Sequence, residues 1–587
     1  MPMPANLNTL QAEIIVEELV RYGIDTFCIS PGSRSTPLVA AAARNRRARV
    51  MMFYDERGSA FYALGYGRAT TRPAAVITTS GTAAANLLPA ICEASVDKVP
   101  LLVLTADRPP ELTDTGANQT LNQAGMFARF VRWDFDFPCP CEPMGAQAVL
   151  TTVDHAVSRS VGIYPGPVHL NCRFREPLEP MQGADETVYT ARIGRWRDSR
   201  EPFTRYEPAC AAVDPAVVES IAQTIGDAQR LMVVVGGLRT DRQQTAVRQL
   251  VAKLRCPVYA DIVSGLRLGG CGTNLIRHYD PQLLGADFNR QARPDVVLHI
   301  GGRTTSKRVG QFFDTNRPRS YIVIKQDPDR YDPVHAVTRH VQTDVAGFCE
   351  SLAEYIESRD EGAFWRFYRN KAEAAHAIIE RHIAAEPGLT EAFVARHLSR
   401  EVPDGTGLFL SNSMPIRDMD LYADTAAQTV RVGANRGISG IDGVVASACG
   451  FAAGLDAPVT AVAGDLAMVH DINSLAIVGR SEPPVIVVTI NNRGGGIFDF
   501  LDISQYKDVF EPYFVAPHDY SFAGVCETFK VKYQTTTTKQ AFADAYRAMV
   551  HEGTSGLIEV PTQRAVNLRL RKAIKTAIIE ALHTEGE

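Results

Sequence analysis

The sequence lacks a hydrophobic run long enough to cross a membrane, because its apolar stretches have the length of strands and fall short of the roughly 20 residues that a membrane helix needs. It also lacks a basic excess: 61 Lys and Arg residues face 66 Asp and Glu residues, for a formal net charge of −5. This balance gives no electrostatic reason to expect nucleic-acid binding. Met1 to Pro4 carry neither the basic nor the apolar segment of a secretory signal, so we expect a cytoplasmic protein without a membrane partner.

Closely spaced cysteine pairs are also scarce. The 11 cysteines are an odd number scattered along the chain, which indicates reduced thiols rather than a disulfide framework. Cys139 and Cys141 form the one close pair, but a single residue separates them and no second pair matches them, which argues against a zinc site. What is present is ordinary globular composition, with 45% hydrophobic and 22% charged residues over 587 positions, enough for about three or four domains.

Apolar runs of strand length alternate with helical stretches along the whole chain, the pattern of α/β proteins with doubly wound parallel sheets. We predict three such domains, at residues 1–185, 210–357 and 385–575, with a polar linker over 182–208 and a helix-rich bridge over 363–384. The first and third domains show the same order of elements, like two copies of one plan. The predicted strands are 26–30, 50–53, 74–79, 100–105, 166–171, 231–235, 258–261, 295–300, 320–325, 408–411, 459–463, 484–490 and 557–560.

Two oxygen-bearing side chains follow neighbouring predicted strands of the third domain. Gly464-Asp465-Leu466 comes directly after one strand, and Asn491-Asn492 ends the next, with a predicted helix over 470–479 between them. Because the carboxyl ends of parallel strands meet at one edge of a sheet, Asp465 and Asn492 should lie close together. Hard oxygen ligands beside glycine turns suit a Mg²⁺ ion completed by water and phosphate. Either residue alone is as well explained by an ordinary turn.

A carboxyl group stands at the start of a helix in the first domain. Glu56 lies in Tyr54-Asp55-Glu56-Arg57, between the strand 50–53 and a run of small and apolar residues, and the turn Ser80-Gly81-Thr82 follows the next strand. Taken alone, an acidic residue at a helix start is a favourable dipole interaction. A carboxyl in a poorly solvated site can instead exchange a proton with a bound ring.

Together the metal-ligand spacing and the surroundings of Glu56 resemble thiamine-diphosphate enzymes, with their pyrimidine-binding, central and diphosphate-binding domains. The resemblance implies thiamine diphosphate as cofactor, with Mg²⁺, or Mn²⁺ in its place, held by Asp465, Asn492 and Gly494. It also implies that Glu56 contacts the aminopyrimidine nitrogen and promotes loss of the proton from thiazolium C2. The implied cofactor-binding residues are Glu56, Ser413, Ile441, Gly464, Asp465, Leu466, Ala467, Asn492, Gly494 and Ile497.

The central domains of related enzymes bind flavin in some members and nothing in others. Here the strand-to-glycine turns at Gly236-Gly237 and Gly301-Gly302 both fall short of the G-x-G-x-x-G pattern that holds a dinucleotide. We therefore expect a central domain without flavin.

Several further loops at strand ends resemble the menaquinone-pathway branch of this family, which couples 2-oxoglutarate to isochorismate. Leu466 supports this branch, because the wider family usually has glycine at that place in the metal motif. Arginines on four separate loops also fit two dicarboxylate substrates, since a planar guanidinium binds a carboxylate in a bidentate manner. The segments that carry the resemblance are Cys28–Leu38, Ala106–Pro110, Gly116–Thr120, Ser411–Arg417, Asn435–Gly443 and Asn492–Phe498.

The resemblance implies a division of the substrate contacts. Arg417 and Arg436 would bind the distal carboxylate of 2-oxoglutarate, and Phe498 with Ile497 would form an apolar wall that keeps water away. The residues that would surround isochorismate are Ser33, Arg34, Arg108, Asn118, Gln119, Lys307 and Ser413.

In this family the pyrimidine-binding domain of one subunit faces the diphosphate-binding domain of another. The expected assembly is therefore a homodimer at minimum and a homotetramer by preference, with active sites at subunit interfaces.

Two rival hypotheses about the function stay open at this point. One is another thiamine-diphosphate decarboxylase or ligase of the acetolactate-synthase type, which would need no cluster of four arginines. The other is a non-catalytic paralogue, which would not need the intact Glu56 or the intact metal pair.

Overall fold

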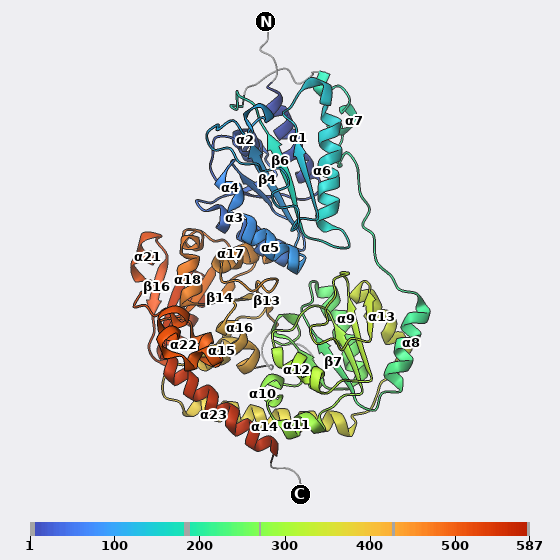
Figure 1. Ribbon diagram of the computed structural model, residues 1–587, viewed down its shortest axis with the longest axis vertical. Helices are drawn as coiled ribbons and strands as arrows, with labels where there is room; N and C mark the ends of the chain where they lie inside the picture. The colour runs from blue at the N-terminus through green and yellow to red at the C-terminus, as the bar shows by residue number, and fades with distance from the viewer. Residues whose placement is uncertain (1–5, 181–187, 269–271, 425–428, 584–587) are drawn as a thin grey trace. The chain divides into compact units, whose positions relative to one another are not determined.

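The computed structural model describes residues 6–180, 188–268, 272–424 and 429–583 (Figure 1). Its strands form three sheets, two of six strands and one of five, and every pairing within them is parallel. This confirms the predicted α/β class with three parallel sheets. The chain divides into two compact units, each considered by itself: unit 1 is residues 1–209, 435–456 and 470–482, and unit 2 is residues 210–434, 457–469 and 483–587.

The first and third sheets have the same strand order. The first runs β2-β1-β3-β4-β6-β5 and the third runs β13-β12-β14-β15-β17-β16, so each strand of one has a counterpart at the same place in the other. The first consists of β1 (Thr26–Ile29), β2 (Arg49–Met52), β3 (Ala75–Thr78), β4 (Leu101–Asp107), β5 (Trp133–Phe137) and β6 (Pro167–Arg173). The third consists of β12 (Gly407–Leu410), β13 (Arg431–Gly433), β14 (Val459–Gly464), β15 (Val485–Asn491), β16 (Lys532–Thr535) and β17 (Gly556–Pro561). The expected repetition of one plan is thus present in the topology.

Unit 1 buries its sheet between two layers of helices. Residues of β1, β3, β4 and β6 that point to one face pack with α1, α2 and α6 in a single apolar cluster, and α3 and α5 cover the other face. Helix α17, from the later part of the chain, packs along α3 within the same unit. The helices of unit 1 are α1 (Leu7–Arg21), α2 (Thr36–Arg44), α3 (Glu56–Thr70), α4 (Thr82–Ala85), α5 (Leu88–Asp97), α6 (Ala146–Val161), α7 (Gly194–Arg197), α17 (Val444–Leu455) and α19 (Leu475–Val478).

Unit 2 holds the other two sheets around one continuous core. The middle sheet, in the order β11-β10-β9-β7-β8, packs one face on α8, α9 and α13. Its other face shares an apolar cluster with α14, α15, α23 and the third sheet. The middle strands are β7 (Leu231–Val235), β8 (Val258–Ala260), β9 (Val296–Ile300), β10 (Ser320–Lys325) and β11 (Arg339–Gln342).

The helices of unit 2 include the predicted helical bridge, which is α14. They are α8 (Pro215–Gly226), α9 (Asp241–Leu254), α10 (Tyr279–Gln282), α11 (Ala286–Gln291), α12 (Lys307–Thr315), α13 (Val345–Tyr355), α14 (Ala363–Ala385), α15 (Glu391–Glu401), α16 (Met414–Tyr422), α20 (Lys507–Phe510), α21 (Ala523–Thr528), α22 (Lys539–Glu552) and α23 (Arg564–His583). Helix α18 (Asp465–His470) begins in unit 2 and ends at the first residue of a unit 1 segment.

Four strands escaped prediction, namely β5, β11, β13 and β16, and each lies at the edge of its sheet. An edge strand pairs on one side only, so it needs no continuous apolar run. Trp133-Asp134-Phe135-Asp136-Phe137 and Lys532-Tyr533-Gln534-Thr535 are accordingly mixed in polarity and partly exposed.

The predicted helix over 470–479 is wrong. Helix α18 begins at Asp465 itself and ends at His470, and a 3-10 turn at Ile472–Ser474 separates it from α19. The break lies at Asp471, whose buried carboxylate accepts hydrogen bonds from the backbone N–H groups of Val445 (2.8 Å) and Ala446 (3.1 Å). That carboxylate therefore caps α17 instead of continuing a helix of its own.

The glycine turns of the central domain have a structural reason. Gly302 N donates to Gly237 O at 3.0 Å, and a Cβ on Gly236 would lie 2.0 Å from Gly302 O. The two turns thus pack directly on each other, which only residues without a side chain permit. Their glycines do not require a dinucleotide phosphate as an explanation.

The predicted linker over 182–208 is only partly a linker. Residues 182–187 lie outside the described residues, but α7 packs on unit 1 through the buried Trp196, with Arg21 3.9 Å from the centre of its ring.

Within the four described ranges every cysteine has a free thiol, and no helix there is both long and apolar enough to span a membrane.

Two buried carboxyls, Glu18 and Asp154, hold this segment. Asp154 accepts from the backbone N–H of Thr204 at 2.8 Å, and Glu18 accepts from the indole N–H of Trp196. Burial and the neighbouring Glu18 carboxyl raise the pKa of Asp154 to about 9, so the group holds a proton at neutral pH. Because this pKa lies above the unfolded value of about 3.9, its stabilisation is complete below about pH 4 and is lost as pH rises to about 9.

Asp154→Asn should therefore flatten the fall of the free energy of unfolding between about pH 4 and 9 and raise the melting temperature at pH 8. The asparagine keeps an oxygen for Thr204 N–H and cannot ionise. Circular dichroism melts across this range check the expectation, with Asp198→Asn, at an exposed helix end, as the matched control. Parallel pH profiles for the parent and Asp154→Asn would contradict it.

Candidate functional site

The strand orders of the two six-stranded sheets each place a candidate crevice at the carboxyl ends of their strands. In the first sheet the chain leaves β1 toward β2 on one side and reaches β3 on the other, so the loops after β1 and β3 diverge. The third sheet repeats this at β12 and β14. Ligands of open parallel sheets bind where such loops part at the carboxyl ends of the strands. The predicted site residues Ser33, Arg34, Ser413 and Asp465 lie on these loops or directly after them.

In unit 1, the loop after β1 lies against the loop after β3. A Cβ on Gly32 would come within 2.3 Å of Thr79 Cβ, so glycine is needed for this approach. The next two residues differ in exposure: Ser33 is exposed, and the Arg34 side chain is 4% exposed. Arg34 is thus held at a fixed place beside the crevice.

Arg34 has protein partners already. Its guanidinium donates to Phe174 O at 2.9 Å and to Glu176 Oε1 at 3.1 Å. Burial, and then the positive charge of Arg108, lower the pKa of Arg34. The two predicted arginines are therefore electrostatic neighbours, and Arg34 has the geometry of a residue that anchors the loop next to Arg108.

The predicted residues Asn118 and Gln119 lie on an exposed loop of unit 1. Gln119 adopts a positive φ of 56°, and its side chain donates to Ser80 O at 3.0 Å, so it holds the turn after β3. Gln123, which sequence reasoning missed, is fully buried beneath this turn and accepts from Gly81 N at 2.8 Å. No motif marks Gln123, because its partners come from distant strand ends.

Glu56 is the first residue of α3, as expected. Asp55 caps the helix by accepting from the backbone N–H groups of Arg57 and Gly58, which leaves the Glu56 carboxylate unused for capping. Its Oε2 accepts from Asn86 Nδ2 at 3.3 Å. Glu56 is only half-buried, so a single copy of the chain does not provide the poorly solvated environment that we predicted.

The loop that carries Arg436 and Ile441 also belongs to unit 1. Its backbone is held by Glu93 of α5, which accepts from Gly437 N at 2.6 Å and Ile438 N at 2.7 Å. Burial raises the pKa of Glu93, whereas the charge of Arg68 and these two N–H donors oppose the rise. Glu93 was not foreseen, since 343 residues separate it from Arg436 (436 − 93).

In unit 2, Asp465 is buried at the start of α18. Its Oδ1 accepts from Leu466 N at 2.7 Å, and its Oδ2 accepts from Gly494 N at 3.0 Å and lies 3.3 Å from His518 Nε2. Burial raises the pKa of Asp465, and the two N–H groups oppose the rise. Around the preceding Gly464, no described atom lies within 4 Å of the place a Cβ would take, so there is room for a ligand beside the carboxylate.

Asn492 follows β15, the strand adjacent to β14. Its Nδ2 donates to Glu391 Oε1 at 2.8 Å, and its Oδ1 is buried without a hydrogen-bond partner among the described residues. Gly494 has a φ of 143°, and a Cβ there would lie 2.4 Å from Val515 O, so this position needs glycine. Asn491 is a structural residue instead, because its amide donates to Tyr520 O and Glu559 Oε1.

These atoms fit a divalent cation. Two adjacent strand ends bring together a buried carboxylate, a glycine turn and an amide oxygen that has no hydrogen-bond partner among the described residues. Hard oxygen donors of this kind are the ligands that Mg²⁺ and Mn²⁺ prefer. His518, whose Nε2 lies 3.3 Å from Asp465 Oδ2, was not foreseen, since its loop carries no motif. In the described part of the chain, no group of three His, Cys, Asp or Glu side chains could hold a metal, so any ion there depends on the amide oxygen and on its ligand.

The loop after β12 links two further predicted residues. Ser413 precedes α16 with a positive φ of 67°, and Arg417 donates to Ser413 O. The buried Ser411 Oγ has no hydrogen-bond partner among the described residues. The loop thus presents polar atoms near the arginine.

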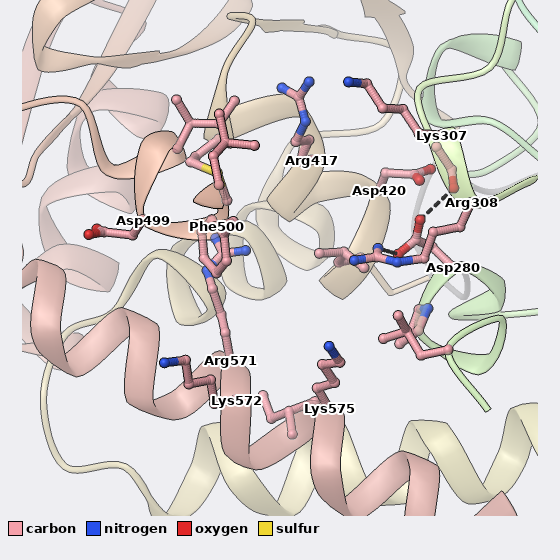
Figure 2. Close-up of a pocket in the computed structure, with 18 of the residues that line it drawn as sticks. Asp280, Lys307, Arg308, Arg417, Asp420, Asp499, Phe500, Arg571, Lys572 and Lys575 are labelled. Carbon is pink, nitrogen blue, oxygen red and sulfur yellow. Dashed lines mark hydrogen bonds and ion pairs between the residues drawn. The ribbon is translucent and has the colours of Figure 1, made fainter. Parts of the chain in front are cut away.

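A cavity of about 740 Å³ in unit 2 brings together four residues that we predicted separately: Lys307, Arg417, Ile497 and Phe498. Figure 2 shows Lys307 and Arg417 at one end, and Lys572 and Lys575 of α23 at the opposite end. Arg308 also lines it but is paired with Asp280. Helices α10 and α12, together with α16 and the C-terminal helix α23, therefore line one basic cavity with an apolar wall, suited to an anionic ligand.

Comparison with protein families gives three consecutive matches. The N-terminal TPP binding domain of thiamine pyrophosphate enzymes matches residues 11–126, the middle domain of thiamine pyrophosphate enzymes matches 187–410, and the C-terminal TPP binding domain matches 426–560.

Curated relatives match over nearly the whole chain. Proteins of Prosthecochloris aestuarii (42% identical, 98% of each chain), Rubrobacter xylanophilus (44% identical, 97% of this chain and 98% of the relative) and Salinibacter ruber (41% identical, 98% of each chain) are similar to it. Each of the three is named 2-succinyl-5-enolpyruvyl-6-hydroxy-3-cyclohexene-1-carboxylate synthase.

Proposed function

The chain belongs to the 2-succinyl-5-enolpyruvyl-6-hydroxy-3-cyclohexene-1-carboxylate synthase family of thiamine-diphosphate enzymes, and we propose that it decarboxylates 2-oxoglutarate and adds the succinyl unit to isochorismate. This is a carbon–carbon bond-forming transfer in menaquinone biosynthesis. The observation that carries the assignment is the sequence identity of 42% and 44% to two of these synthases, along almost the full length of this chain and of each relative. A partial match would have left the substrates open, since folds are shared among many activities.

Thiamine diphosphate, when bound, supplies a nucleophilic carbon and an electron sink for the loss of CO₂. The residues that would hold its diphosphate are Gly464 to Ala467, where β14 ends and α18 begins, and the loop Asn492 to Gly494, through Mg²⁺ or Mn²⁺ at Asp465, Asn492 and Gly494. The open space at Gly464 and the unused Asn492 Oδ1 support this placement. Ile441 and Ile497 would contact its rings.

The side chains of this protein then have separable tasks. Glu56 would hold and return a proton at the aminopyrimidine nitrogen, as a carboxyl already hydrogen-bonded by Asn86 can do. Arg417 and Lys307, at one end of the basic cavity, would bind carboxylates, and Phe498 would exclude water. Arg108, with Arg34 fixing its surroundings, would bind a carboxylate of isochorismate together with Ser33, Asn118 and Gln119.

We also propose that the protein acts as a homodimer at minimum, and as a homotetramer by preference, in the cytoplasm. Two features of unit 1 support further burial by a partner subunit. Glu56 is only half-buried, and the neighbouring edge strand β2 and the segment after it expose Val50, Met52 and Tyr54, the last at 71%.

The assignment can be tested with purified protein supplied with thiamine diphosphate, Mg²⁺, 2-oxoglutarate and isochorismate. We expect a product whose mass equals both substrates less CO₂. Pyruvate in place of 2-oxoglutarate is the comparison. Product formed from pyruvate but not from 2-oxoglutarate would support an acetolactate-type enzyme and contradict the proposal.

The two substrates can be separated with arginine variants. Arg417→Ala should slow CO₂ release from 2-oxoglutarate by about 10- to 100-fold even without isochorismate, the usual effect of one lost charge-assisted contact. Arg108→Ala should leave that release close to the parent rate and raise the KM for isochorismate. CO₂ release measured with and without isochorismate decides the matter, with Arg242→Ala, at an exposed ion pair, as control. Equal slowing in both variants would contradict the division.

A further inference from the structure

Three charged side chains are buried behind Asn492 in unit 2. Glu391, Arg571 and Asp418 have side-chain exposures of 6%, 8% and 4%, and they form a chain of contacts that ends at the Asn492 amide. Charged groups are rarely buried unless they have partners and a reason to be retained. None of the three belongs to a motif of the sequence.

The position of Glu391 is fixed by its backbone. It is the first residue of α15, which Thr390 caps by accepting from Phe393 N, and its own N–H donates to Asn567 Oδ1 of α23 at 3.0 Å. Its carboxylate therefore enters the interior from a defined point between two helices. A side chain held in this way can orient another group.

The contact with Asn492 decides which end of the amide faces the candidate ion. Glu391 Oε1 accepts from Asn492 Nδ2 at 2.8 Å, and a carboxylate can only accept, so the amide cannot be turned around without placing two oxygens together. Asn492 Oδ1 is thereby left as the buried oxygen without a partner among the described residues. An amide free to turn could present its nitrogen instead, which does not bind a cation.

The charge of Glu391 is compensated away from Asn492. Its other oxygen, Oε2, accepts from Arg571 Nη2 at 3.3 Å, and Arg571 also pairs with Asp418. Asp418 lies on α16 next to Arg417, the predicted substrate residue. Arg571 therefore joins the surroundings of Asn492 to the helix that carries Arg417, and it also lines the cavity (Figure 2).

We propose that Glu391 is a positioning residue for the divalent cation: it holds the Asn492 amide with its oxygen directed at the ion, and Arg571 balances its charge and ties it to α16. The inference rests on the proposed ion site at Asp465 and Asn492. Partners that orient metal ligands typically affect ion affinity by about 10- to 100-fold. A merely structural Glu391 would instead affect folding alone.

Glu391→Met tests this directly, because methionine keeps the length and volume of the side chain and removes the acceptor. Folding should be retained, since Arg571 keeps Asp418 as a partner. With thiamine diphosphate present and Mn²⁺ as the probe, electron paramagnetic resonance of free Mn²⁺ should show binding about 10- to 100-fold weaker than in the parent. Glu350→Met, at a surface pair with Arg242, is the matched control and should bind like the parent.

A double-mutant cycle separates positioning from any other effect. If Glu391 acts through the amide, Glu391→Met should add little to the loss already caused by Asn492→Ala. The inference would be overturned if Glu391→Met weakened Mn²⁺ binding equally in the parent and in the Asn492→Ala background. It would also be overturned if Glu391→Met bound Mn²⁺ like the parent. Asp465→Ala distinguishes failure of this inference from failure of the proposed ion site. If Asp465→Ala weakens Mn²⁺ binding and Glu391→Met does not, only the inference about Glu391 fails. If neither variant weakens Mn²⁺ binding, the proposed ion site fails as well.

Discussion

Glu56→Gln is expected to lower turnover by about 10²- to 10⁴-fold, the usual share of a positioned proton-transfer group, while the cofactor still binds. The amide has the size and hydrogen-bonding reach of the carboxyl, so α3 and its cap at Asp55 should be unaffected. It cannot, however, exchange a proton with the aminopyrimidine nitrogen. The decisive measurement is the rate of hydrogen–deuterium exchange at thiazolium C2, followed together with steady-state turnover.

The control is Glu111→Gln, which changes an exposed carboxylate of unit 1 that pairs with Arg175 and should leave both rates as in the parent. Asn86→Ala is informative as well, because it removes the donor to Glu56 Oε2 and should produce a smaller loss. An exchange rate in Glu56→Gln equal to that of the parent would show that the carboxyl does not activate the cofactor.

Asp465→Ala is the second variant with a large expected effect. It removes the buried carboxylate from the proposed ion site and should weaken Mg²⁺-dependent binding of thiamine diphosphate by at least about 100-fold. Loss of a residue that only orients a metal ligand costs up to about 100-fold in affinity, and loss of the ligand itself should cost no less. The loss should be specific to the ion, because the backbone groups of Leu466 and Gly494 that it accepts from remain in place.

Titration of thiamine diphosphate into the apoprotein, with and without Mg²⁺, measures this effect by fluorescence or calorimetry. Asp544→Ala, at an exposed aspartate of the same unit, should behave like the parent. Unchanged affinity in Asp465→Ala with Mg²⁺ present would rule out the carboxylate as a ligand.

The sheets were predictable where strands are buried on both faces. Runs such as Leu231–Val235 and Val485–Asn491 are buried throughout and almost entirely apolar, because helices cover both sides of the sheet, so composition alone reveals them. Edge strands such as β11, which contains the half-buried Arg339 and the exposed His340, carry no such run, and pairing with β10 rather than local composition makes them strands. The break in the helix at Asp471 could not be predicted either, since it depends on hydrogen bonds from the N-terminus of α17 to the Asp471 carboxylate.

The positions of the site residues were predictable for a related reason. Glycine turns directly after strands must lie at the carboxyl edge of a parallel sheet, so Asp465 and Asn492 could be assigned to one edge from order alone. The same reasoning placed Ser33 and Arg417 beside their crevices. It could not tell that Arg34 is already engaged with Phe174 and Glu176, because those partners lie about 140 positions further along the chain.

By itself, then, the sequence determined the α/β class, the repeated plan of the first and third sheets, and the strand ends that Glu56, Asp465 and Asn492 follow, because periodicity and glycine turns are local properties. Only the tertiary structure decided how these groups are held. Glu391 reaches Asn492 across 101 positions, and Glu93 reaches Gly437 across 344. Such contacts follow from the packing of helices on sheets, and the orientation of an amide or the burial of a carboxylate is set by neighbours that no local pattern specifies.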